Sequence, residues 1–144
     1  MIIRQARETD LPVILRLYQD LAGLYAGVHA VDAEECRSAW QRICADTRQY
    51  LLVAEVDDVV IGTLNLTIIP NLGHGGQPWA AIDNVIVSAE CRGQGIGVTM
   101  LEEAGNIARQ QRCYKLFCPA ILYARKPMNF TANWAGKKHT SDFH

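Results

Sequence analysis

The most constraining feature of the sequence is the stretch from Ala80 to Phe117, which predicts a strand, a tight glycine turn, a helix and a second strand in direct succession. The Ile and Val run around Val85 is typical of a strand that is buried on both faces. The turn from Arg92 to Gly97 contains three glycines, and a helical pattern begins straight after it. A helix start offers unpaired N–H groups and about half a positive charge. The stretch therefore predicts a unit in which bare backbone binds phosphate.

Two other phosphate motifs do not fit this turn. The dinucleotide-binding motif needs G-x-G-x-x-G and an acidic residue roughly 20 residues further on. Here the glycines run G-x-G-x-G, and no acid lies around Cys113 to Phe117. The P-loop needs Gly-Lys-Ser/Thr, whereas Gly97 is followed by Val98 and Thr99. Both motifs are excluded.

What remains is Arg-x-x-Gly-x-Gly after an Ile/Val-rich strand, with Arg92, Gly95 and Gly97 at the defining positions. This pattern resembles the GNAT superfamily of N-acetyltransferases, whose signature is Arg/Gln-x-x-Gly-x-Gly/Ala. The resemblance implies an α+β fold with a central mixed sheet flanked by helices. It also implies that the turn holds the pyrophosphate of acetyl-coenzyme A, while the preceding strand pairs with the pantetheine arm. The competing interpretation is an ordinary tight strand-to-helix turn. The implied cofactor-binding residues are Val85, Ile86, Val87, Arg92, Gly93, Gln94, Gly95, Ile96, Gly97 and Val98.

The rest of the chain supplies the other elements that such a sheet needs. We expect a helix that Thr9 or Asp10 caps and a second that Asp32 caps, the latter burying Trp40, Ile43 and Cys44. The expected elements are a strand over 2–6, helices over about 10–25 and 32–47, strands over 50–56 and 59–68 joined by a turn at Asp57-Asp58, a turn-rich loop over 70–78, a central strand opened by Trp79, and a strand over 114–118.

Composition narrows the class of protein. The 144 residues are enough for one domain, and a formal net charge of −1 gives no general case for nucleic acid or anionic membranes. No apolar run approaches the roughly 20 residues that span a bilayer. The five cysteines lack framework spacing and no signal peptide precedes them, so we expect reduced, buried thiols in a cytoplasmic protein, with no metal site.

The end of the chain departs from the family. After its last predicted strand a GNAT protein normally has a helix with Tyr-x-x-x-Gly-Phe/Trp and two more strands. Residues 119–144 are polar and without periodicity, so the sequence predicts a GNAT-like domain over 1–118 and an atypical, irregular tail over 119–144, with the last helix and strands lacking or altered. The Tyr of the missing motif is the family's usual general acid, and no residue here matches it. We therefore expect diminished or absent activity relative to an intact relative.

A shift of reading frame offers an explanation for this tail. Reading the codons of residues 127–139 one base earlier forces Glu at one position, and Leu-Gly where Asn133, Trp134 and Ala135 supply the bases. The other positions permit the peptide Glu-Leu-Tyr-Arg-Lys-Leu-Gly-Trp, which resembles the missing motif. Our hypothesis is a frameshifted GNAT C-terminus. Resequencing of the gene tests it, because a stop codon or a wrong residue there would end the idea.

The implied chemistry is direct transfer of an acetyl group to an amine. Asp83 is the candidate catalytic base, since it lies on the central strand and is predicted to share a face with Val85 and Val87. A strand-end carboxylate that orders a neighbouring loop is the alternative. Asn84 is predicted to point the other way. Aromatic and His side chains that would line the acceptor site are Tyr25, His29 and Trp79, for which a structural role is the alternative.

Two functions remain open from the sequence. The first is an acetyl-coenzyme A-dependent N-acetyltransferase acting on a small-molecule or peptide amine. The second is a coenzyme A-binding protein without turnover that self-associates, for instance as a homodimer, through an exposed sheet edge. The scattered cations of the tail are fewer than a nucleic-acid site needs.

Overall fold

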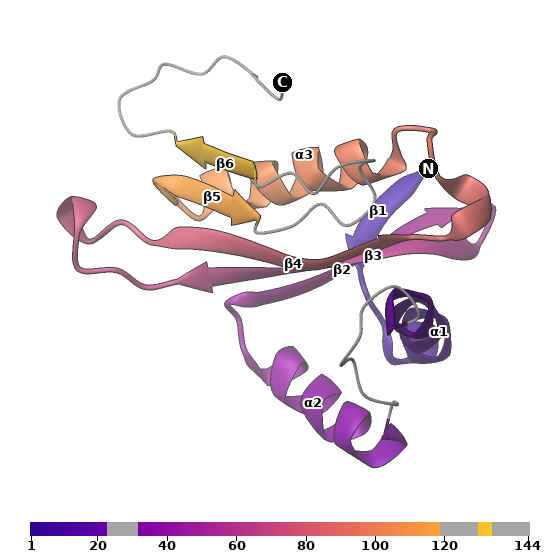
Figure 1. Ribbon diagram of the computed structural model, residues 1–144. Coiled ribbons are helices and arrows are strands. Elements are labelled where there is room, and N and C mark those ends of the chain that lie inside the picture. The colour runs from indigo at the N-terminus through magenta and orange to yellow at the C-terminus, as the bar shows by residue number, and fades with distance from the viewer. Residues whose placement is uncertain (23–31, 119–129, 134–144) are drawn as a thin grey trace.

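The protein is built on one twisted sheet with helices on both faces (Figure 1). The computed structural model describes residues 1–22, 32–118 and 130–133. The six strands are adjacent in the order of the chain, and every neighbouring pair is antiparallel except β4 and β5. This confirms the predicted α+β mixed sheet. The strands are β1 (Ile2–Gln5), β2 (Gln49–Val56), β3 (Val59–Ile69), β4 (Trp79–Val87), β5 (Lys115–Cys118) and β6 (Phe130–Asn133), and the helices are α1 (Leu11–Ala22), α2 (Ala33–Ala45) and α3 (Ile96–Gln110).

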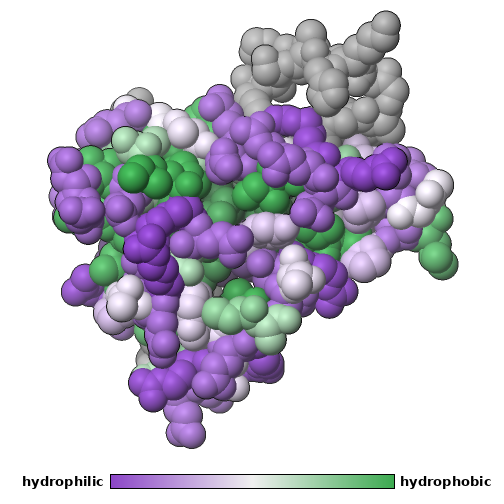
Figure 2. All heavy atoms as spheres, turned by 180° about the vertical axis from the view of Figure 1, so that it is seen from behind, coloured by the Kyte–Doolittle hydropathy of each residue, from purple (hydrophilic) through white to green (hydrophobic). Residues whose placement is uncertain are grey.

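Each face of the sheet has its own apolar core. Helix α3 covers one face, where Met100, Leu101 and Ala104 pack on strand residues such as Leu64 and Leu66. Helices α1 and α2 cover the other face (Figure 1), where Ile14 lies in a cluster with Leu51, Val53 and Val60. Side chains alternate between faces along a strand, so β2 and β3 contribute to both cores. The surface seen from behind is mostly hydrophilic, and its apolar residues lie in separate patches (Figure 2).

Two local predictions are confirmed at element ends. Asp57 and Asp58 have φ values of 49° and 62°, the left-handed pair that a two-residue hairpin turn between β2 and β3 requires. Asp32 caps α2, and its carboxylate accepts the backbone N–H groups of Glu34 and Glu35 at 2.9 and 3.0 Å.

The start of α1 differs in detail from the predicted cap. The Asp10 carboxylate accepts the backbone N–H of Arg7 at 2.7 Å, in the short 3-10 turn that precedes α1. It also accepts two hydrogen bonds from the Arg4 guanidinium, whose Nε donates to Glu55 on β2 at 2.9 Å. The guanidinium lowers the pKa of the Asp10 carboxyl below its usual value. Asp10 therefore joins β1, the turn and β2 rather than only capping a helix.

The prediction that every cysteine is buried is wrong for Cys44, which is exposed. Helix α2 buries none of its residues completely, and only Trp40 and Ile43 pack against the core, so the side that carries Cys44 remains in solvent. Cys113 and Cys118 are buried as predicted, and burial raises the pKa of the Cys113 thiol to about 11.

The prediction of an irregular tail is wrong for residues 130–133, which form β6. This strand pairs antiparallel with the whole of β5, from Lys115 opposite Asn133 to Cys118 opposite Phe130. Four residues are too few for a strand periodicity to be recognised in a sequence, so only the long-range pairing reveals it. The remainder of the tail lies outside the described residues, as do Tyr25 and His29.

Candidate active site

The turn between β4 and α3 leads directly into the start of a helix (Figure 1). Gly93 and Gly95 have φ values of 77° and 79°, which favour glycine, and a Cβ atom at either position would meet no atom within 4 Å. Gly95 is the N-cap of α3, no side chain caps that helix, and its first turn holds no acidic residue. The first N–H groups of α3 thus have no side-chain acceptor among the described residues.

Arg92 holds this turn against the strand before it. Its Nε donates a hydrogen bond to the carbonyl oxygen of Val87, the last residue of β4, at 2.9 Å. The predicted phosphate-binding Arg92 therefore has a definite structural part in closing the turn. Of the other predicted cofactor-binding residues, Ile96 is buried in the α3 core while Val98 is exposed.

Strands β4 and β5 diverge after a short contact. Only Ala80 and Ala81 of β4 pair with β5, opposite Leu116 and Phe117. Within the described residues, β4 from Ile82 to Val87 has no strand partner on its β5 side, although β3 pairs along its other side. An unpaired strand edge therefore leads to the glycine turn, as the sequence resemblance implies.

A β-bulge in β4 changes the predicted face of the sheet on which its side chains lie. Asn65 of β3 pairs with Asp83, and Thr63 pairs with Ile86, so β4 has one more residue than β3 between these pairs. Asn84, within the bulge, has a φ of 51°. Its backbone N–H donates to Asp83 Oδ1 at 2.8 Å.

Because of the bulge, the prediction that Asp83 shares a face with Val85 and Val87 is wrong. Val85 and Val87 pack in the α3 core together with Ile82. Asp83 has shifted to the opposite face, where Ile86 packs on Leu17 of α1. Strict alternation across positions 83–87 fails, since the extra residue reverses the faces from Val85 onward.

On this face Asp83 lies within electrostatic range of Tyr18, a residue of α1. Burial, first, and the negative charge of Asp83 together raise the pKa of the Tyr18 phenol to about 12, although hydrogen bonding to the Asn84 side chain acts in the opposite direction. Tyr18 is therefore a neutral hydroxyl at physiological pH. The site combines a carboxylate and a phenol from different elements.

Sequence analysis also missed the polar residues of β3 on this face. Thr63, Asn65 and Thr67 alternate with Leu64, Leu66 and Ile68, a pattern that predicts one polar and one apolar face. The Thr63 hydroxyl donates to the carbonyl oxygen of Leu52 at 2.9 Å. Thr67 donates to Gln49 Oε1 at 3.2 Å, so two of the three have partners within β2.

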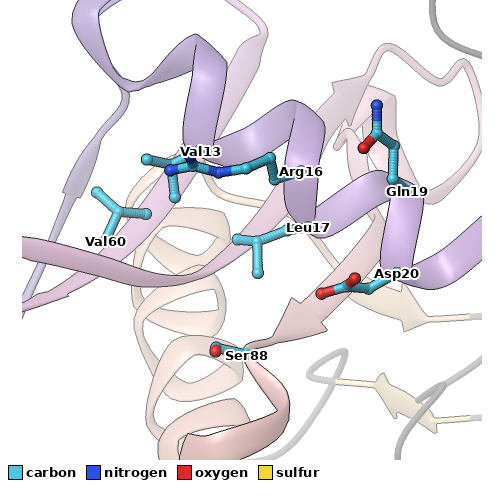
Figure 3. A pocket seen from close by; sticks show the side chains of 7 residues that line it. All are labelled: Val13, Arg16, Leu17, Gln19, Asp20, Val60 and Ser88. Atoms are coloured by element: carbon cyan, nitrogen blue, oxygen red, sulfur yellow. The ribbon is translucent and has the colours of Figure 1, made fainter.

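A pocket of about 380 Å³ lies on the same side of the sheet, between α1 and the end of β4. Arg16, Leu17 and Asp20 line it from α1, and Ser88, directly after β4, lines its other side (Figure 3). The pocket thus adjoins the segment that leads into the glycine turn. The pocket is lined by one cationic side chain, Arg16, and one carboxylate, Asp20, so it favours neither a cationic nor an anionic ligand.

Trp79 lies at the opposite end of β4 from the glycine turn. It is half-buried, and the Lys115 Nζ lies 4.9 Å from its ring centroid. In the preceding loop His74 stacks on Tyr114, with ring centroids 3.8 Å apart.

The described residues include no group of three or more His, Cys, Asp or Glu side chains that could hold a metal ion. Nor does any helix among them have the length and apolar character to cross a bilayer.

Comparison with known proteins agrees with this geometry. The sequence model of the acetyltransferase (GNAT) family matches residues 14–130, and the chain belongs to that family. A glucosamine 6-phosphate N-acetyltransferase from Trypanosoma brucei brucei is 32% identical over 57 residues, which span 40% of this chain and only 39% of that relative.

Two solved structures show how far the likeness extends. A protein from Agrobacterium tumefaciens str. C58 superposes with a TM-score of 0.76 and 28% identity, covering 86% of this chain and 84% of its own. A ribosomal-protein-alanine N-acetyltransferase from Brucella melitensis superposes with a TM-score of 0.67 and 29% identity, covering 82% and 73%. The α+β fold and the family assignment are thereby confirmed.

Proposed function

We propose that this protein is an N-acetyltransferase that uses acetyl-coenzyme A and acetylates a primary amine by direct transfer. The observation that carries the proposal is the uncapped start of α3 behind the glycine turn, at the end of an unpaired edge of β4. The N–H groups of the first α3 residues, Ile96 to Val98, suit the pyrophosphate. The open edge from Val85 to Val87 suits the amide groups of the pantetheine arm.

Holding the thioester beside the amine supplies most of the acceleration, since effective molarities of positioned groups reach about 10⁵ M or more. The amine must also lose a proton before it attacks. Asp83 suits the role of base because it is exposed and lies at the bulge of β4, where the open edge begins. Its bond to the Asn84 N–H supports a structural role as well.

For the acceptor we propose a small-molecule or peptide amine. The relatives named above include a glucosamine 6-phosphate N-acetyltransferase and a ribosomal-protein-alanine N-acetyltransferase, so both kinds of amine are represented. Five cysteines without a disulfide are consistent with action in the reducing cytoplasm.

The test measures thiol release from acetyl-coenzyme A in the presence of glucosamine 6-phosphate, a peptide with N-terminal alanine, and other primary amines. We expect release that depends on the amine, together with an increase in Tm on addition of coenzyme A. Stabilisation without thiol release would favour the alternative, an inactive coenzyme A-binding protein. The absence of both would exclude the two functions together.

Asp83→Asn tests the proposed base. Because a positioned base contributes typically 10²- to 10⁴-fold, we expect kcat near neutral pH to fall by about that factor, with the loss shrinking at high pH, where the free amine is already deprotonated. Asp58→Asn is the matched control, since it changes an aspartate in the β2–β3 turn, seven residues before Asn65, the partner of Asp83, and asparagine tolerates the left-handed φ of that position. An unchanged kcat across pH would leave Asp83 with the structural role only.

A further inference from the structure

Asn65 carries a buried side-chain oxygen that lacks a partner. Its Oδ1 atom is shielded from solvent and has no hydrogen bond. Almost all buried polar groups in native proteins are hydrogen-bonded, and leaving one unpaired lowers stability. On the same face of β3 the neighbouring hydroxyls of Thr63 and Thr67 both have acceptors within β2. The unpaired oxygen is therefore a specific feature of Asn65 among the polar residues of this face.

The position of Asn65 connects this oxygen with the proposed active site. Asn65 is the direct cross-strand partner of Asp83, at the first pair beside the β4 bulge. Side chains of directly opposed residues lie on the same face of a sheet with their Cβ atoms about 5 Å apart. Both residues thus belong to the face that α1 covers, where Asp83 acts electrostatically on Tyr18.

The groups around this point are complementary to an amine. The Asn65 Oδ1 atom can accept hydrogen bonds but cannot donate them. The same holds for the Asp83 carboxylate when it is ionised. The Tyr18 phenol remains protonated. Two acceptor oxygens on adjacent strands, one of them charged, suit a group with at least two N–H donors and a positive charge. A primary ammonium group has both properties.

We propose that Asn65 Oδ1 accepts an N–H of the acceptor amine and, together with Asp83, selects primary over N-methylated amines. This inference rests on the proposed function and adds a specificity residue to it. The ammonium group gives one proton to Asp83, and the resulting neutral amine keeps one N–H on Asn65 while its lone pair attacks the thioester carbonyl. The C–N bond forms, the C–S bond breaks, and the second nitrogen proton passes to the leaving sulfur. After it has given one proton to Asp83, an N-methyl amine has a single N–H, which cannot both stay on Asn65 and pass to the leaving sulfur.

The experiment uses Asn65→Leu, which keeps the volume and removes the oxygen, and Asn65→Asp, which keeps the oxygen. Thr67→Val is the matched control, because it makes a polar-to-apolar change on the same face of the same strand at a group that already has a partner. The substrates are glucosamine 6-phosphate and a peptide with N-terminal alanine, each compared with its N-methyl counterpart. The readouts are KM, kcat, and the Tm with and without coenzyme A.

For Asn65→Leu we expect a KM for the primary amine that is about three- to tenfold higher, as for loss of one hydrogen bond, and a smaller preference over the N-methyl amine. The Tm of the ligand-free variant should rise, since a buried unpaired oxygen has been removed. Asn65→Asp should retain the preference. Thr67→Val should lower the Tm and leave the preference unchanged.

Two results overturn the inference while the proposed function stands. One is an unchanged preference in Asn65→Leu, and the other is a lower Tm of that variant without ligand, which would mean that the oxygen stabilises the fold. In both cases the wild-type protein still releases thiol and is stabilised by coenzyme A. A wild-type protein with neither property refutes the proposed function, and the inference with it.

Discussion

Arg4 is the residue that joins most of the N-terminal elements. Its guanidinium bonds Asp10 before α1 and Glu55 on β2, while its own backbone lies in β1. The side chains of Arg4, Asp10 and Glu55 are 17%, 9% and 15% exposed, so solvent screens these ion pairs less than it screens surface pairs. Removing one partner should therefore leave a poorly solvated charge behind.

Asp10→Asn should lower the free energy of unfolding by about 1.5–3 kcal/mol at pH 7. The pKa of Asp10 is lowered in the folded protein, first by the Arg4 hydrogen bonds. Its contribution is therefore present above the unfolded pKa of about 3.9 and is lost as the pH falls through the folded value. Urea unfolding at pH 7, 5 and 3 should show that the difference in the free energy of unfolding between variant and wild type becomes smaller as the pH falls.

The control for this prediction is Glu8→Gln, which neutralises an exposed acid in the same turn. It should change the free energy of unfolding by no more than about 0.5 kcal/mol. If the difference in the free energy of unfolding between Asp10→Asn and the wild type stayed constant between pH 7 and pH 3, this would contradict the role given to the charge of Asp10.

At the scale of elements, the glycine turn and α3 act as one unit. Gly95 and Gly97 both belong to the Arg-x-x-Gly-x-Gly signature, but their backbone conformations differ. Gly95 has a left-handed φ, whereas Gly97 does not, and a Cβ atom at Gly97 would lie 3.9 Å from the Val87 side chain, an ordinary contact. Only the first of the two glycines is required by its backbone conformation.

Gly95→Ala should lower the free energy of unfolding by about 1–2 kcal/mol, because alanine is strained in the left-handed region, and it should weaken the stabilisation by coenzyme A. Gly97→Ala is the matched variant, and we expect it to fold with unchanged or slightly higher stability, since alanine is favoured within a helix. Thermal unfolding with and without coenzyme A measures both. Equal losses in the two variants would argue against the assigned conformations.

The elements also show what the sequence could predict. The strand–turn–helix unit, the Asp32 cap and the Asp57-Asp58 turn were predictable because neighbouring residues determine them. The bulge at Asn84 was not, since it depends on how β4 meets β3, and it moves Asp83 to the other face. Asn65 was missed for the same reason, because its significance arises only from the strand opposite it.

At the scale of the molecule, β6 lies at the edge of the sheet that the described residues form. Since β6 pairs with β5 along its full length, the outer edge of the described sheet on this side belongs to residues 130–133 and not to β5. These residues lie within the segment on which the frameshift hypothesis rests. The atypical tail therefore contributes a strand to the sheet, whatever its origin.

A chain that ends at Cys118 should be less stable than one that ends at Asn133. The shorter chain loses every β5–β6 hydrogen bond and exposes a strand edge that can pair with another copy. We expect a Tm lower by about 4 °C for each kcal/mol lost, between the values for smaller and larger domains, and association that increases with concentration. Thermal unfolding and sedimentation of the two truncated chains measure this, and identical behaviour would show that β6 contributes nothing.

The agreement between strand order and chain order has a consequence for synthesis. Each strand can join the growing sheet as soon as it leaves the ribosome, because its neighbour has already emerged. The hairpin of β2 and β3, the strand β4 and the turn that follows it are all complete before the final residues are translated. An alteration confined to the codons after β5 would thus reach a nascent protein in which β1 to β4 and the glycine turn have already been synthesised.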